Sequence, residues 1–210
     1  MKTLDLSLYV ISGQCFTPER ELLKVMEEAL AGGATVIQLR EKNMTIRELV
    51  EVGAKLQKLA RQHGATFIIN DHVDVALAID ADGVHLGQDD LSVSEARTLL
   101  GPKKIIGLST HSLEQALAAS SLPLDYLGVG PVFTTPTKPD TRPVGLELLT
   151  EVSRQLTVPF VAIGGIDETN LEQVLATGAR NVAVIRAVVA AADVTGAARR
   201  LRARIATQTA

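Results

Sequence analysis

The chain has 210 residues, a formal net charge of −3 and few aromatic residues, which make up 3% of the total. The length fits one domain, and the charge excludes a diffuse basic surface for a polyanion such as nucleic acid. The single cysteine, Cys15, cannot form an internal disulfide, and no stretch approaches 18 uninterrupted apolar residues. The first residues do not have the pattern of a secretory signal. We therefore expect a cytoplasmic protein without membrane or nucleic-acid partners that acts on small molecules.

Eight short apolar runs recur along the chain, and most lack alternating polar residues. Such runs are typical of parallel strands that are buried on both faces. In chain order they are Leu6–Ser12, Thr35–Leu39, Thr66–Ile69, Gly83–Leu86, Lys104–Leu108, Tyr126–Val129, Phe160–Ile163 and Asn181–Ile185. Amphipathic segments between the runs, such as Glu19–Ala31 and Thr45–Arg61, predict helices. Glycines such as Gly64 and Gly178 are placed to end helices just before the next strand.

Eight strands that alternate with helices predict an α/β fold, a (β/α)8 or TIM barrel, as a single domain over residues 1–210. A doubly wound open sheet is the alternative. That fold usually carries a glycine-rich dinucleotide turn after its first strand, and Ser12-Gly13-Gln14-Cys15 does not match it. The longest expected loop, Gly130–Val144, has a length typical of a functional lid.

Polar residues follow seven of the eight predicted strands, whereas the strand starts carry few of them. In a (β/α)8 barrel the reacting groups lie at the carboxyl ends of the strands. The polar segments are 38–42, 70–71, 87–90, 109–112, 134–138, 164–165 and 186. This asymmetry predicts an active site at one rim of the barrel.

The residue types at these strand ends indicate two anion-binding sites. Asp71 and Asp90, with Asn70 nearby, supply the hard oxygen ligands that Mg²⁺ prefers. Cations on separate loops can surround one anion; they are Arg40, Lys42 and Lys138. Gly164-Gly165 can offer bare backbone N–H groups to a phosphate. The pattern thus predicts one site with metal and side-chain cations and a second site built from backbone.

Each feature also has a simpler structural explanation. Asp71 is placed to cap a following helix, and Asp90 or Ser92 to cap the next one. Arg40 and Lys42 can belong to a solvated charged loop.

Other polar residues are interpreted as structural. His85 lies within a predicted strand, which is typical of a core or barrel-lining residue, and no histidine or cysteine spacing suggests zinc. Cys15 lacks a recognisable base partner. A basic stretch near the end of the chain lies opposite an apolar helical stripe, so we expect its side chains to face solvent; it comprises Arg199, Arg200, Arg202 and Arg204.

Five segments in order carry a resemblance to a known family over nearly the whole chain. They are VIQLREK (36–42), INDHVDVALAIDADGVHLGQDDL (69–91), IGLSTHS (106–112), DYLGVGPVFTTPTK (125–138) and AIGGI (162–166). The chain resembles the thiamine-phosphate synthases. The resemblance implies a small (β/α)8 barrel that joins 4-amino-2-methyl-5-hydroxymethylpyrimidine diphosphate to 4-methyl-5-(2-hydroxyethyl)thiazole phosphate, and so makes thiamine phosphate and pyrophosphate.

The resemblance also implies the roles of individual residues. Around the pyrimidine diphosphate it places Gln38, Arg40, Lys42, Asn70, Ser109 and Lys138. Catalytic roles within that set fall to Arg40, Lys42, Ser109 and Lys138. At the thiazole phosphate it places Thr135, Pro136, Thr137, Gly165, Ile185 and Arg186. Asp71 and Asp90 would hold Mg²⁺. Apart from the resemblance, Phe133 adjoins the Thr135–Lys138 segment and is for that reason a candidate wall for the flat pyrimidine.

Two positions depart from the family pattern. Arg186 stands where the family commonly has serine, and the sequence does not show where its side chain points. His72 stands where many relatives have arginine, so it is left out of the site.

Three other functions are alternatives to that of a synthase. A thiazole tautomerase of the same fold family would not need the diphosphate and metal residues, which this chain retains as Asn70, Asp71, Asp90 and Lys138. A non-catalytic sensor would not need the metal pair either. An epimerase or aldolase needs a base or a Schiff-base lysine inside the barrel, and the one strand lysine, Lys104, lies at a strand start. The sequence leaves the oligomeric state open, including a homo-oligomer.

Overall fold

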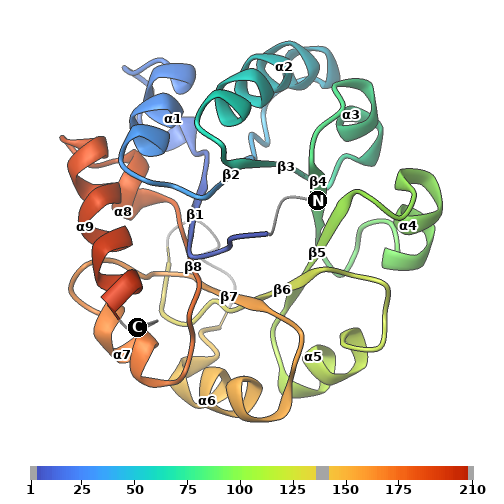
Figure 1. The fold of residues 1–210 in the computed structure, drawn as a ribbon, viewed down its shortest axis with the longest axis vertical. Helices are drawn as coiled ribbons and strands as arrows, with labels where there is room; N and C mark the ends of the chain where they lie inside the picture. Colours follow the sequence, from blue (N-terminus) through green and yellow to red (C-terminus); the bar gives the residue numbers. More distant parts are fainter. Residues whose placement is uncertain (1–3, 136–141, 208–210) are drawn as a thin grey trace.

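The computed structural model describes residues 4–135 and 142–207. Within them, parallel strands close into one barrel in the order β1 to β8, with the helices outside it (Figure 1). This confirms the (β/α)8 fold and excludes the open sheet. The strands are β1 Leu8–Ile11, β2 Val36–Leu39, β3 Thr66–Asn70, β4 Gly83–Leu86, β5 Ile105–Thr110, β6 Tyr126–Val129, β7 Phe160–Ile163 and β8 Val182–Val184.

The helices follow the strands in the expected alternation. They are α1 Leu22–Ala31, α2 Ile46–Gln62, α3 Val73–Ala78, α4 Val93–Leu100, α5 Leu113–Ala119, α6 Gly145–Gln155, α7 Leu171–Ala176, α8 Arg186–Val189 and α9 Val194–Thr207, with a 3₁₀ turn at Gln14–Phe16. The first helix begins three residues later than predicted, because the backbone is still extended at its N-cap, Glu21. The second begins where Thr45 and Glu48 form a reciprocal capping box.

Alternation along each strand produces two separate hydrophobic clusters. In β1, Leu8 and Val10 belong to the large cluster between strands and helices, whereas Tyr9 and Ile11 belong to a smaller cluster inside the barrel. The inner cluster also receives Leu6, which lies in the segment that crosses the barrel before β1 (Figure 1). The barrel is therefore a packed core, and the space for a ligand lies toward one rim.

The basic stretch of α9 faces solvent in part, because Arg199 and Arg200 are exposed whereas Arg202 and Arg204 are half-buried. The apolar stripe of α9 is buried, and Arg200, Arg202 and Arg204 form ion pairs with the acidic residues Glu168, Asp5 and Glu172 respectively. Among the described residues, no helix has both the length and the apolar character needed to cross a bilayer.

Candidate active site

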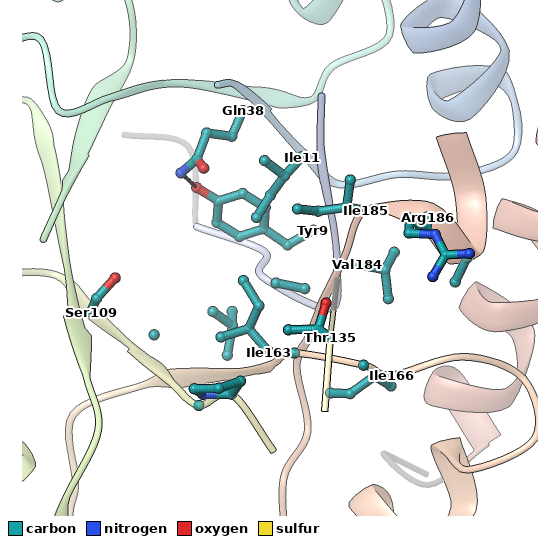
Figure 2. Close-up of a pocket in the computed structure, with 18 of the residues that line it drawn as sticks. Tyr9, Ile11, Gln38, Ser109, Thr135, Ile163, Ile166, Val184, Ile185 and Arg186 are labelled. Atoms are coloured by element: carbon teal, nitrogen blue, oxygen red, sulfur yellow. Dashed lines mark hydrogen bonds between the residues drawn. The ribbon is translucent and has the colours of Figure 1, made fainter. Parts of the chain in front are cut away.

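A cavity of about 400 Å³ lies at the carboxyl ends of the strands, and every strand of the barrel contributes to its wall. Figure 2 shows its lining side chains converging from β1, β2, β5, β7 and β8. The structure brings most of the predicted substrate residues to this wall: Gln38, Arg40, Asn70, Ser109, Thr135, Gly165, Ile185 and Arg186. The rim asymmetry read from the sequence thus corresponds to one continuous cavity.

Three described residues of the predicted site do not line this cavity: Lys42, Asp71 and Asp90. All three are exposed. Pro136, Thr137 and Lys138 lie outside the described residues, as does part of the expected lid. Phe133 packs against the outer hydrophobic cluster and is not among the lining residues of the described wall, so its contact with the pyrimidine stays a prediction.

The β2 side of the cavity carries the cation Arg40, whose backbone is anchored. Gln38 is buried, and the backbone N–H of Arg40 donates to Ser12 Oγ at 2.9 Å. This bond holds the end of β2 against β1, so that Arg40 enters the cavity wall from an anchored backbone. The positive charge of Arg40 also lies near Asp71, where it partly offsets the rise in the pKa of that carboxyl that other groups cause. Arg40 is half-buried in the cavity wall, and its role at an anion stays a prediction.

Asp71 and Asp90 meet at the rim beside Arg40. Asp71 has a φ of 62°, a rare conformation for a residue other than glycine, and its backbone N–H donates to the His85 carbonyl at 2.9 Å. Asp90 accepts a bond from the Gly87 N–H at 2.7 Å through Oδ2. Neither carboxylate caps a helix, because the α3 N-cap is His72 and Ser92 caps α4. The strained turn at Asp71 instead places its carboxylate beside that of Asp90.

Loss of solvent and the neighbouring carboxylate together raise the pKa of Asp71 to about 6. Loss of solvent is the largest cause, and a hydrogen bond and charge repulsion from Asp90 follow it. A divalent cation held by both groups relieves that repulsion. Among the described residues no group of three or more acidic, histidine or cysteine side chains gathers. A pair fits Mg²⁺, which keeps waters and phosphate oxygens as its remaining ligands.

The opposite side of the barrel, at β7 and β8, presents backbone to the cavity. Gly164 and Gly165 have φ values of 104° and 67°. A Cβ on Gly164 would lie 2.4 Å from Pro131, and one on Gly165 would lie 2.7 Å from the Thr134 carbonyl. Asn170 fixes this turn, because its Nδ2 donates to the Gly165 carbonyl at 2.8 Å. Only glycine fits both positions. The turn and the first residues of α8 line the same cavity.

Arg186 begins α8, and the structure shows where it points. Its guanidinium lies over the Phe16 ring, 5.7 Å from the ring centre. The residue is exposed and its side chain lies at the right of Figure 2, well away from Tyr9 and Gln38. The change from serine therefore adds a positive charge at the rim next to the backbone of α8.

Two polar residues of the wall, Tyr9 and Asp167, lie outside the polar segments that the sequence predicts. Tyr9 could have been found from the alternation of β1, which turns it inward with Ile11. Asp167 lies shortly after the glycine pair, and the Thr169 hydroxyl holds the pKa of its carboxyl below the usual value. His111 belongs to the predicted polar segment 109–112, but its bond through Nδ1 to the remote Gly130 carbonyl could not be predicted.

The barrel, its carboxylate pair and its glycine turn define the chain as a phosphate-handling (β/α)8 enzyme. Residues 8–188 match the profile of the family described as thiamine monophosphate synthase. The chain belongs to the thiamine-phosphate synthase family, whose members are transferases of thiamine biosynthesis.

Individual relatives agree over almost the full length. The chain is 51% identical over 197 residues to the thiamine-phosphate synthase of Shouchella clausii, covering 93% of this chain and 94% of the relative. It is also 51% identical over 193 residues to that of Halalkalibacterium halodurans, covering 91% and 92%. The solved thiamine phosphate pyrophosphorylase of Pyrococcus furiosus superposes with a TM-score of 0.90 at 45% identity, covering 98% of each chain.

Proposed function

We propose that this cavity performs the condensation of a pyrimidine diphosphate with a thiazole phosphate, and that each anion binds at its own side of the rim. The observation that carries the proposal is that Arg40 and the Gly164-Gly165 turn line opposite sides of one cavity. The Asp71–Asp90 pair lies outside the lining of that cavity, beside Arg40. Two substrates held this way meet over the centre of the barrel.

The pyrimidine diphosphate is assigned to the β2 to β5 side of the cavity. The residues assigned to it are Gln38, Arg40, Asn70 and Ser109 of the described wall, with Lys42 and Lys138 from the loops. On the β7 to β8 side it places the thiazole phosphate, bound by Gly165 and by the backbone at Ile185 and Arg186. Thr135, Pro136 and Thr137 are assigned to the same phosphate.

The reaction is proposed to be dissociative. The bond between the exocyclic carbon and the diphosphate oxygen breaks first, and its electron pair leaves with pyrophosphate. The 4-amino group donates electrons into the ring and stabilises the resulting cation. The thiazole nitrogen then forms the new C–N bond with its lone pair. Because that nitrogen carries no proton, the step needs no general base, which fits a wall that offers a cation and hydrogen-bond donors.

Asp71 and Asp90 are the residues proposed to hold Mg²⁺, because their oxygens approach each other at the rim beside Arg40. Bound there, the ion would neutralise part of the charge that gathers on the departing pyrophosphate. Arg40, whose backbone is anchored at the end of β2, is proposed to contribute to the same neutralisation through its guanidinium.

Binding experiments can test the two-site arrangement without any turnover. Calorimetric titration with pyrophosphate and Mg²⁺, and separately with thiazole phosphate, is expected to give one site for each. Because the sites lie on opposite sides of the cavity, saturation with one ligand should leave the affinity for the other unchanged or improved. Competition between the two ligands would show that they share one site and would contradict the proposal.

Stabilisation by Mg²⁺ is expected to increase with pH. Since the folded protein raises the pKa of Asp71 to about 6, the ligand-free protein loses stability as pH rises from the ordinary carboxyl range to about 6. Mg²⁺ needs the charged carboxylate and competes with the proton, so it should raise the melting temperature more at pH 7.5 than at pH 5. An equal shift at both pH values, or an unchanged shift in Asp71→Asn, would place the metal elsewhere.

Three expectations from the sequence stay predictions. Residues 1–210 as a single domain, a cytoplasmic location and a homo-oligomeric state are tested by limited proteolysis, cell fractionation and the mass of the protein in solution respectively.

A further inference from the structure

A chain of hydrogen bonds runs along the wall of the cavity inside the barrel and joins side chains from five strands. Gln38 Nε2 donates to the Tyr9 hydroxyl at 2.7 Å, a bond drawn in Figure 2, and the Tyr9 and Tyr126 hydroxyls lie 2.9 Å apart. The Tyr126 hydroxyl lies 3.0 Å from His85 Nδ1. His85 Nε2 lies 2.9 Å from Ser109 Oγ, where the chain ends. The proposed reaction assigns roles to the two ends, Gln38 and Ser109, and none to the three residues between them.

The donor at one end favours one direction for the whole chain. An amide nitrogen can only donate, so the Tyr9 oxygen accepts from Gln38 and its own proton is available to Tyr126. In that direction Tyr126 donates to His85 Nδ1. An imidazole that accepts at Nδ1 and stays neutral carries its proton on Nε2, and His85 then donates to Ser109 Oγ. The Ser109 hydroxyl proton is thereby left for an acceptor in the cavity.

Burial keeps both phenols in their donor state. Tyr9 and Tyr126 are almost fully buried, and loss of solvent raises the pKa of each hydroxyl above its usual value. The Tyr126 ring also packs at a tilt against the His85 ring, with centroids 5.4 Å apart. Neither phenol ionises near neutral pH, so both hydroxyls keep the proton that the chain needs.

Two glycines make room for the chain inside the barrel. A Cβ on Gly107 of β5 would lie 2.2 Å from the Tyr126 ring and 2.6 Å from His85 Nδ1. A Cβ on Gly128 of β6 would lie 3.0 Å from His85 Cε1. A glycine inside a strand weakens the strand, so two facing the same histidine indicate that its position matters beyond packing.

We propose that Tyr9, Tyr126 and His85 are positioning residues that fix the Ser109 hydroxyl as a hydrogen-bond donor toward the bound pyrimidine diphosphate. The acceptor class is an oxygen of the leaving diphosphate, on which negative charge grows as its bond to carbon breaks. A donor aligned before the reaction stabilises that charge without reorganisation. This role rests on the proposed function, whereas the direction of the chain does not.

The direction can be measured in the ligand-free protein by nitrogen NMR with ¹⁵N-labelled histidine. The chain has 4 histidines, and the signals of His85 are assigned by their loss in His85→Gln. We expect His85 as the neutral tautomer with its proton on Nε2, and loss of that single tautomer in Tyr126→Phe. A proton on Nδ1 in the parent protein, a charged imidazole, or an unchanged tautomer in Tyr126→Phe would overturn the proposal. Because no substrate is present, this result is independent of the proposed function.

Kinetics test the role in the reaction. Tyr126→Phe is expected to lower kcat roughly 10- to 100-fold, the usual cost of losing a group that orients a contacting residue, with an unchanged KM for the thiazole phosphate. Thr110→Val is the control, since it deletes another buried hydroxyl, bonded to the Gly128 carbonyl, outside the chain. A comparable fall of kcat in Thr110→Val would attribute the effect to general damage of the barrel and would overturn the proposal.

Two replacements of His85 distinguish the effect of the hydrogen-bond direction from the effect of side-chain shape. Glutamine can accept from Tyr126 through its oxygen and donate to Ser109 through its nitrogen, whereas leucine can do neither. His85→Gln should keep most of the kcat that His85→Leu loses, and His85→Leu should fall as far as Ser109→Ala. Equal losses in the glutamine and leucine variants, or parent-like activity in His85→Leu, would show that the bond direction does not matter.

Discussion

Replacement of Arg40 with alanine is expected to lower kcat/KM for the pyrimidine diphosphate by roughly 10²- to 10³-fold, the usual cost of losing a fixed group that stabilises developing charge. Arg40 lines the cavity from the anchored end of β2 and faces the carboxylate pair. In the Arg40→Ala variant, the departing pyrophosphate lacks the cation of the cavity wall that is assigned to it. The KM for the thiazole phosphate should change little, because that anion is assigned to the opposite side of the barrel.

Two further variants sharpen this prediction. Arg40→Lys keeps the charge but not the planar fork, so it should recover only part of the lost activity. Arg47→Ala removes an exposed arginine from the first turn of α2 and should behave as the parent enzyme. Equal weakening of both substrates in Arg40→Ala would assign Arg40 to overall stability of the rim rather than to the diphosphate.

Replacement of Asp90 with asparagine is expected to reduce turnover by roughly 10²-fold or more at low Mg²⁺, with partial recovery as Mg²⁺ is raised. The amide keeps an oxygen that can accept the Gly87 N–H bond, so the loop should hold while the charge is lost. Initial rates measured against Mg²⁺ concentration provide the test.

The neighbouring residue offers a matched control. Asp89→Asn removes the same charge one position earlier, on an exposed side chain, and should leave both the rate and the Mg²⁺ dependence unchanged. A similar loss of turnover in Asp89→Asn and Asp90→Asn would attribute the effect to the loss of negative charge in this region, and not to the loss of a metal ligand. Parent-like Mg²⁺ dependence in Asp90→Asn would show that the carboxylate pair is not the metal site.

The barrel could be predicted from the sequence because its strands have a local signature. Runs such as Thr66–Ile69 and Phe160–Ile163 are short and apolar without alternation, which is what burial on both faces requires. Once the fold was expected, the rule that chemistry lies at the carboxyl ends of the strands placed Arg40 and Ser109 on one rim. Helix starts were less certain because a cap depends on one backbone conformation, as at Glu21.

The internal hydrogen-bond chain could not be predicted in the same way. His85 was expected inside the barrel, but its bond to Tyr126 depends on the alignment of β4, β5 and β6 around Gly107. Tyr9 and Tyr126 are still further apart along the chain. Likewise, the approach of Asp71 to Asp90 depends on a positive φ that an aspartate adopts only rarely. Contacts of this kind follow from strand register and backbone strain, which local patterns do not encode.

The most direct measurement of the central claim is a single assay with purified protein, both substrates and Mg²⁺. The account predicts equal amounts of thiamine phosphate and pyrophosphate, with no product when either substrate is omitted. A protein that isomerises a thiazole substrate and forms no bond between the two rings would contradict it.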